Sequence, residues 1–275
     1  MTIQNHSMLV NMTIHRWTAT KHDRSVSNEV ERTHQARNAG RYNKQLIDKA
    51  HLVEIDRLSN QLRAFHYQHT LPWAEEGARL LPTKLFLTYQ SGIFDLREKR
   101  DRAVEQFLTT YPQLVNDARS RLNTMFDPTD YPSVEKLREK FGVDVEYMPV
   151  PNANDFRVDI AHELQEGVRQ QMLQSISARQ EKMVADCWQR VREVVSRIAE
   201  QCSNPKGRIH DSLMENAQSL ADVIDGLNIT ANSDIAYVGE QLRALIVDPD
   251  RLRTSPVTRS AVALNAEQIL RRIPA

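Results

Sequence analysis

Apolar residues recur at about every fourth position from Asp159 to Gln201, in a stretch that has no proline and a single glycine. The stripe consists of Ile160, Leu164, Val168, Met172 and Ile176, followed after a polar interval by Val184, Cys187, Trp188, Val191, Val195, Ile198 and Cys202. This spacing predicts one unbroken helix, about 64 Å long at roughly 1.5 Å per residue. A compact globule of this chain length has a diameter of about 50 Å. The helix would exceed it, so we expect an elongated protein whose apolar stripe needs another surface to cover it.

Two short segments alternate between apolar and polar residues, which is the period of a β-strand. They cover residues 8–17 and 143–148, and we expect them to pair with each other because a single strand leaves its backbone groups unpaired. Helical spacing predicts further helices over residues 44–69, 85–110, 133–141, 209–226, 235–246 and 256–273. After the second of these helices, Pro112 either kinks the chain or starts a new helix that ends near Phe126. Ser255 and Pro256 form the N-cap and first-turn pair of the last helix.

These elements predict a mainly α fold of the α+β class, with long helices in an elongated bundle or helical hairpin and a small two-stranded β element. Pro149 and Pro151 open a stretch up to Asp155 that we interpret as a hinge. We therefore expect a mixed α+β domain with the small sheet over residues 1–150. An α-helical hairpin or bundle domain would then occupy residues 151–275.

Charge and glycine content narrow the classes of function. The chain has 36 Lys+Arg against 36 Asp+Glu, so no global field favours nucleic acid or an anionic membrane. Only 8 of the 275 residues are glycine, against a usual share of about 7%, which disfavours glycine-rich phosphate loops. No apolar run approaches the roughly 20 residues of a membrane-spanning helix, and the N-terminus lacks a signal-peptide pattern. We expect a soluble, cytoplasmic protein without membrane contact.

Residues that could catalyse a reaction or bind a metal form no recognisable motif. His162 and Glu163 begin like a zinc-protease helix, but Glu166 stands where the second histidine is needed. His66 and His69 lie three positions apart without an indicated third ligand. We interpret them as exposed histidines at a helix end.

Cys187 and Cys202 both lie on the apolar stripe, about 22 Å apart along a straight helix. This separation disfavours a disulfide and indicates buried thiols in a reducing compartment. We therefore expect no enzymatic activity, no cofactor and no metal site. An enzyme with an unrecognised site stays open as an alternative.

The segment 15–49 is the best candidate for a binding surface. It carries eight basic and four acidic residues, a net charge of +4, and aromatic rings that can stack with bases. The residues that we predict for partner contact are Arg16, Trp17, Arg41, Tyr42, Asn43 and Lys44. Two alternatives stay open: a solvated connector that pairs with acidic helices, and a helix start at Lys44 with Asn43 as its N-cap.

Several short strings of residues follow one another along the chain in an order that resembles a known family. They are Trp17–Asp23, Gly40–Lys44, His66–Trp73, Gly77–Pro82, Asp130–Ser133 and the stretch Met148–Arg157. Together they resemble an uncharacterised family of tailed-phage and prophage proteins with a domain-of-unknown-function label. Its genes sit beside a MoxR-type AAA+ ATPase and a protein with a von Willebrand factor A domain. The resemblance covers nearly the whole chain and implies a bacteriophage protein in the host cytoplasm with these partners. It carries over no catalytic residue.

The pattern and the resemblance together lead to one functional hypothesis. We expect a non-enzymatic phage assembly protein, a helical bundle or coiled coil that forms a homo-oligomer and acts as adaptor or substrate of a MoxR-type AAA+ ATPase. A nucleic-acid-binding protein of phage replication or recombination is one alternative, based on segment 15–49. A virion structural protein is the other.

Overall fold

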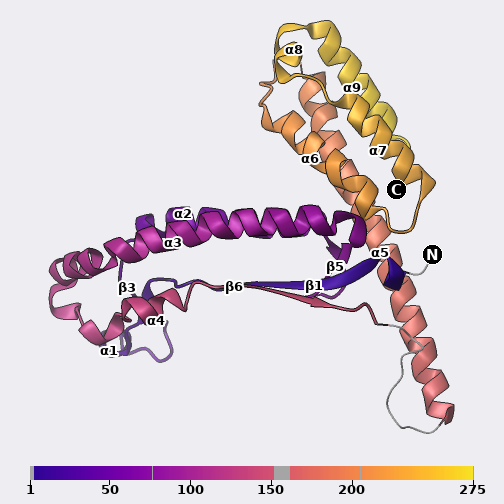
Figure 1. Cartoon of the computed structure of the whole chain (residues 1–275). Helices are drawn as coiled ribbons and strands as arrows, with labels where there is room; N and C mark the ends of the chain where they lie inside the picture. Colours follow the sequence, from indigo (N-terminus) through magenta and orange to yellow (C-terminus); the bar gives the residue numbers. More distant parts are fainter. Residues whose placement is uncertain (1–2, 76, 152–161, 205, 275) are drawn as a thin grey trace. The chain divides into compact units, whose positions relative to one another are not determined.

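The computed structural model describes residues 3–75, 77–151, 162–204 and 206–274. It is mainly helical with a small antiparallel sheet (Figure 1), which confirms the predicted class. The chain forms two compact units. Unit 1 contains residues 1–11, 66–90 and 146–275, and unit 2 contains residues 12–65 and 91–145.

Each unit is assembled from stretches that lie far apart in the sequence. In unit 1, for example, the side chain of Leu85 packs against Gly226, where an added Cβ would lie 2.5 Å from the leucine. The compact units therefore do not coincide with the predicted domains 1–150 and 151–275. The part of the predicted hinge after Pro151 lies outside the described residues.

The C-terminal part of unit 1 is a helical bundle. Its helices are α5 (His162–Ser203), α6 (Ser212–Leu227), α7 (Ser233–Leu245), α8 (Pro249–Thr254) and α9 (Pro256–Leu270). Helix α5 packs against α6 and α9, and α6 packs against α7 (Figure 1). Val191, Val195 and Ile198 of α5 are fully buried in this bundle. As predicted, Pro256 occupies the first turn of α9, and the Ser255 hydroxyl caps it by accepting the Thr258 N–H at 3.2 Å.

The prediction of one long helix is confirmed in α5. It runs without a break over 42 described residues, about 63 Å at roughly 1.5 Å per residue. Asp159 and Ile160, where the predicted stripe begins, lie outside the described residues.

The sheet has the strand order β4-β5-β1-β6. Its strands are β1 (Ser7–Ile14), β4 (Leu71–Pro72), β5 (Arg79–Pro82) and β6 (Val143–Met148). Leu80 of β5 lies opposite Leu9 of β1 and Leu71 of β4. All three leucines are buried, so the centre of the sheet is apolar on one face.

The two strands predicted from alternation are present, and β1 and β6 are neighbours as expected. The predicted two-stranded element is wrong in extent, because this sheet has four strands among the described residues. Strands β4 and β5 span only two and four residues, and each includes a proline, which is depleted in strands. Segments this short show no alternation from which a strand could be predicted.

Unit 2 is built on α2 (Val53–His69) and α3 (Phe86–Leu122), each of which begins or ends in unit 1. The Phe65 ring of α2 fills the space above Gly92 of α3, where an added Cβ would lie 2.1 Å from the phenyl Cζ. Helix α3 continues through Pro112 to Leu122, so no new helix starts at the proline.

The predicted helix over 44–69 begins later than expected. Residues 43–45 form strand β3 (Asn43–Gln45), which pairs with β2 (Thr20–His22), and a 3₁₀ turn (Lys49–Leu52) precedes α2. The interpretation of Asn43 as an N-cap is therefore wrong. Lys44 lies opposite Lys21 in this two-stranded ladder.

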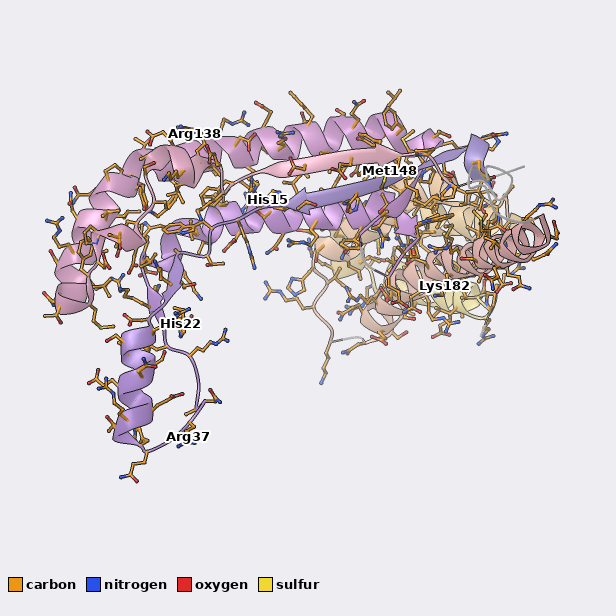
Figure 2. All side chains as sticks on the ribbon, turned by 90° about the horizontal axis from the view of Figure 1, so that it is seen from below. His15, His22, Arg37, Arg138, Met148 and Lys182 are labelled. Atoms are coloured by element: carbon orange, nitrogen blue, oxygen red, sulfur yellow. The ribbon has the colours of Figure 1, made fainter. Side chains whose placement is uncertain are left out.

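Helix α1 (Arg24–Thr33) occupies a segment for which the sequence predicted no helix. Asp23 caps it by accepting the N–H groups of Ser25 and Val26 at 3.0 and 3.2 Å. The helix has no buried residue, so it lacks the apolar stripe on which the prediction depended. Figure 2 shows Arg37 just beyond the C-terminal end of α1, with its side chain pointing outward.

The remaining helical elements are short. They are the 3₁₀ turns Ile3–Asn5, Thr83–Leu85, Asn123–Met125 and Pro128–Asp130, and the helix α4 (Val134–Arg138). The core of unit 2 contains Ala19, Ile47, Leu52, Ile55, Val104, Phe107, Leu108, Tyr111, Leu137 and Phe141.

Candidate functional site

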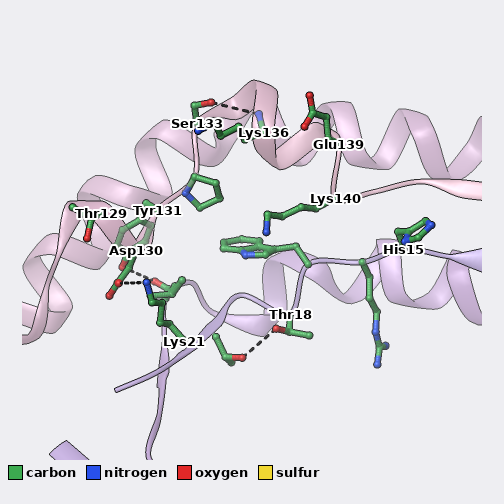
Figure 3. A pocket seen from close by; sticks show the side chains of 15 residues that line it. His15, Thr18, Lys21, Thr129, Asp130, Tyr131, Ser133, Lys136, Glu139 and Lys140 are labelled. Carbon is green, nitrogen blue, oxygen red and sulfur yellow. Dashed lines mark hydrogen bonds and ion pairs between the residues drawn. The ribbon is translucent and has the colours of Figure 1, made fainter. Parts of the chain in front are cut away.

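Unit 2 contains an open polar pocket of about 910 Å³. One wall is the chain from residues 15 to 21, between β1 and β2, and the other is the chain from residues 129 to 140, which includes α4. Figure 3 shows Lys21 and Asp130 meeting at one end of the pocket and His15 at the other.

The indole of Trp17 lies in the first wall and is held by two aromatic rings of α3. Its centroid is 5.8 Å from that of Tyr111, edge to face at 82°, and 6.2 Å from that of Phe107. These contacts fix the plane of the indole, which still lines the pocket. Arg16, beside it, is 3.7 Å from Asp56 in an exposed ion pair.

A buried arginine, Arg100, lies on the side of the first wall that faces away from the pocket. The Arg100 side chain is fully buried, and its guanidinium donates to the His15 carbonyl at 2.7 Å and to the Ser59 hydroxyl at 2.9 Å. The Nη1 group has no hydrogen-bond partner among the described residues. Burial lowers the pKa of Arg100, yet a guanidinium keeps its charge in proteins. The charge therefore contributes a positive field at this wall.

The second wall presents two lysines. The Ser133 hydroxyl caps α4 by accepting the Lys136 N–H at 3.4 Å, which starts the turn that carries Lys136, Glu139 and Lys140 along the pocket. All three side chains are exposed. Neither lysine has an ion-pair partner in the part of the chain that the structure describes.

A buried ion cluster closes one end of the pocket. The Asp130 carboxylate lies 2.7 Å from the Lys44 ammonium and 3.0 Å from that of Lys21. Lys44 also donates to the Met125 carbonyl at 2.8 Å and lies 3.6 Å from Asp23. The Lys44 and Asp130 side chains are only 6% and 7% exposed.

Both members of the central pair have shifted pKa values. Burial would lower the pKa of Lys44, but the hydrogen bond and charge of Asp130 outweigh it and raise the pKa above 10.5. Burial would raise the pKa of Asp130, but the hydrogen bonds from Lys44 and Lys21 outweigh it and lower the pKa below 3.8. The pair is therefore fully ionised at neutral pH.

The predicted contact residues divide into three groups. Arg16 and Trp17 line the pocket. Lys44 is buried, so a partner could not reach its ammonium without breaking the ion cluster.

Arg41, Tyr42 and Asn43 are exposed but do not line the pocket. Their contact with a partner stays a prediction. Lys136 and Lys140 were not among the predicted contact residues. The N-cap at Ser133 and the spacing of four between the lysines could have indicated that they share one side of a helical turn.

The interpretation of His66 and His69 as exposed residues is wrong, because both are only 4% exposed. The His66 imidazole forms a hydrogen bond of 2.8 Å with the Tyr89 hydroxyl. Burial, aided by the charge of Arg79, lowers the pKa of His66 to about 4. No three His, Cys, Asp or Glu side chains converge as a metal site within the described ranges.

Cys187 and Cys202 are free and buried, as predicted. Burial raises the pKa of the Cys187 thiol to about 12. At neutral pH this thiol is protonated and cannot act as a nucleophile.

A second candidate surface lies on α5 in unit 1. The apolar stripe is buried from Cys187 to Cys202, but in the exposed segment of α5, residues 166–182, no residue is fully buried. Leu173 is 43% exposed, and Val168, Met172 and Ile176 are partly exposed. Figure 2 shows Lys182 at the end of this segment.

The surface continues into a mostly apolar groove of about 560 Å³. The groove is lined by Pro274 near the C-terminus and by residues of α5, namely Gln180, Glu181, Val184, Ala185, Trp188, Gln189 and Arg192. The exposed segment and the groove together form a continuous track along one helix.

Comparisons with protein-family models, curated proteins and solved structures give no match to this chain. The resemblance to the phage family stays a prediction. Among the described residues, no helix combines the length and apolarity needed to cross a membrane.

Proposed function

We propose that this chain is a non-enzymatic helical assembly protein that self-associates through the exposed segment of α5 and serves as adaptor or substrate of a MoxR-type AAA+ ATPase. The observation that carries the proposal is the apolar stripe of α5, which continues for about five helical turns beyond the part that helices α6 and α9 cover, although Arg179 near the end of this segment packs on Trp73. An apolar face that stays in water is unfavourable and commonly marks an interaction site.

A second copy of the chain is the occupant that these residues favour. Val168, Met172 and Ile176 step by four, so they form one ridge of the kind that interdigitates with an identical ridge at a crossing angle of about −50°. The flanking charges have both signs, including the Glu166–Arg169 pair, and the net charge of the chain is zero. Two copies would therefore meet without net repulsion.

Two further observations support a protein without catalytic chemistry. The Cys187 thiol is protonated at neutral pH, and the His66 imidazole is buried and neutral. The role of the ATPase in the proposal depends on the family resemblance, and the self-association depends on α5.

Native mass spectrometry and light scattering over a range of concentrations test self-association. We expect a dimer or higher oligomer for the native chain and a monomer for Met172→Glu/Ile176→Glu. The matched control is Gln174→Glu/Ala178→Glu, which adds the same charges at the same spacing on the opposite face of α5, where both side chains are exposed. A strict monomer for the native chain, or equal dissociation in both double variants, would refute self-association through this face.

Co-purification with the MoxR-type ATPase tests the proposed role as its adaptor or substrate. We expect the native chain to bind the ATPase in the presence of nucleotide and to change its rate of ATP hydrolysis. Absence of both effects with a correctly assembled native chain would refute the adaptor or substrate role and leave self-association standing.

A further inference from the structure

The pocket of unit 2 combines the aromatic side chain of Trp17 with two exposed lysines, Lys136 and Lys140, that have no ion-pair partner among the described residues. Of its two carboxylates, Asp130 is already neutralised by Lys44 and Lys21. The remaining carboxylate, Glu139, lines the pocket together with two lysines, Lys136 and Lys140. The second wall therefore carries an excess positive charge in a concave, polar site.

The first wall adds positive charge. Arg16 has only a long exposed contact with Asp56, and His15 is paired with Asp144 at 2.9 Å. Behind them, Arg100 is buried and donates to two neutral acceptors, its Nη1 group has no hydrogen-bond partner among the described residues, and Asp101 and Asp56 partly balance its charge. Because basic side chains outnumber acidic ones around this concave site, the arrangement attracts an anion.

The aromatic side chain restricts the class of anion. Trp17 is packed on the core against Tyr111 and Phe107, and its partly exposed indole lines the pocket, where it offers an aromatic surface to a flat ring. Nucleobases stack on such side chains, while basic residues hold the phosphate. A pocket of about 910 Å³ lies within the range of roughly 300–1,000 Å³ that is usual for small-ligand sites.

From this geometry we infer that the pocket binds a nucleoside phosphate, with the base on Trp17 and the phosphate between Lys136 and Lys140. The ligand is a free nucleotide or one unit of a single strand, because the bases of a duplex are already stacked on each other and cannot reach Trp17. The site lies in unit 2 and does not depend on self-association through α5, so the two proposals can fail separately.

The test is fluorescence anisotropy of a labelled oligo(dT) strand with the full chain at low salt. Competition with unlabelled dTMP, oligo(dT) and duplex DNA identifies the form of the ligand. We expect single strands to compete and duplex to compete poorly. If dTMP competes as well as oligo(dT) at equal nucleotide concentration, the ligand is the free nucleotide; if only oligo(dT) competes, it is the single strand.

Two variants and one control locate the site. Lys136→Gln/Lys140→Gln removes two exposed charges, and we expect weaker binding and a logarithmic salt slope smaller by about 1.4. Trp17→Leu should weaken binding by about 5- to 150-fold. The control Lys49→Gln/Lys99→Gln removes two exposed lysines of unit 2 that do not line the pocket, and we expect little change.

Three outcomes would overturn the inference. The first is no binding of oligo(dT) or dTMP at low salt. The second is equal weakening in the pocket and control lysine variants. The third is competition by duplex as strong as by single strands. Circular dichroism of each variant separates loss of binding from loss of fold, and the lysine variants keep the test valid if Trp17→Leu unfolds.

Discussion

The Asp130 carboxylate lies 2.7 Å from the Lys44 ammonium, and both side chains are almost completely buried. These residues come from β3 and from the 3₁₀ turn Pro128–Asp130. The pair therefore joins two stretches of unit 2 that are far apart in the sequence, and its removal should affect stability more than any surface contact would.

Replacing Lys44 tests this role. Lys44→Met leaves the Asp130 carboxylate buried with a single exposed partner, and removing one member of a buried pair costs about 3–5 kcal/mol. We expect the free energy of unfolding in urea to fall by an amount in this range. The control is Lys21→Met, which removes the exposed partner of the same carboxylate and should cost about 1 kcal/mol or less. If both variants lower the free energy of unfolding equally, the burial of Lys44 does not add to the stability that its ion pair provides.

The same pair sets a pH window. The pKa of Asp130 is lowered, so its contribution to stability is present above its ordinary value of 3.8 and is lost as pH falls through the folded-state pKa. The pKa of Lys44 is raised, so its contribution is present below 10.5 and is lost as pH rises through the folded-state pKa. We expect the stability difference between native chain and Lys44→Met to be constant from about pH 5 to 9 and to shrink outside it. A steady change in this stability difference between pH 5 and 9 would contradict a Lys44–Asp130 pair that is ionised throughout that range.

His66 should make the fold sensitive to mild acid. Its pKa is lowered from 6.5 to about 4 in the folded chain, so the folded state disfavours the protonated form. The contribution of neutral His66 to the free energy of unfolding is complete above pH 6.5. It is lost as pH falls toward 4, by up to about 3 kcal/mol. Urea unfolding at several pH values measures it, and His66→Gln, which cannot titrate, is the control. An NMR titration of the His66 ring with a midpoint near 6.5 would rule the prediction out.

The contact between Gly92 and Phe65 leaves no room for a methyl group, because the added Cβ would lie 2.1 Å from the ring. Gly92→Ala should therefore destabilise the chain by about 1–3 kcal/mol through overpacking. Gly167 is the matched control, since it is also helical and, apart from its own helix, no atom of the described residues lies within 4 Å of its Cβ position. Gly167→Ala should stabilise α5 by up to about 1 kcal/mol. If Phe65→Leu does not relieve the effect of Gly92→Ala, the ring is not the cause.

The features that the sequence predicted correctly depend on neighbours along the chain. The stripe of α5, the alternation of β6 and the Ser255–Pro256 start of α9 each arise from residues a few positions apart. Such patterns reflect the geometry of a single helix or strand, so they can be recognised before any tertiary contact is known.

The features that it missed depend on distant partners. His66 is buried because it packs with Tyr89, 23 residues away, and nothing near His66 in the sequence indicates that packing. Lys44 was predicted as an exposed contact, but its partner Asp130 comes from a separate stretch. The sequence predicted one wall of the pocket, because Arg16 and Trp17 were among the expected contact residues. It did not predict the opposite wall, which contains Lys140.

The pairing of β2 with β3 has a consequence for protein engineering. Because these strands form an antiparallel ladder, the chain between His22 and Asn43 acts as the connection of a hairpin, and α1 within it has no buried residue. A tight two-residue turn such as Asn-Gly could join the same strands. Residues 28–40 are therefore a suitable place to graft an epitope tag or a fluorescent reporter, because Ser27, whose hydroxyl bonds His22 and Tyr42, then stays in place.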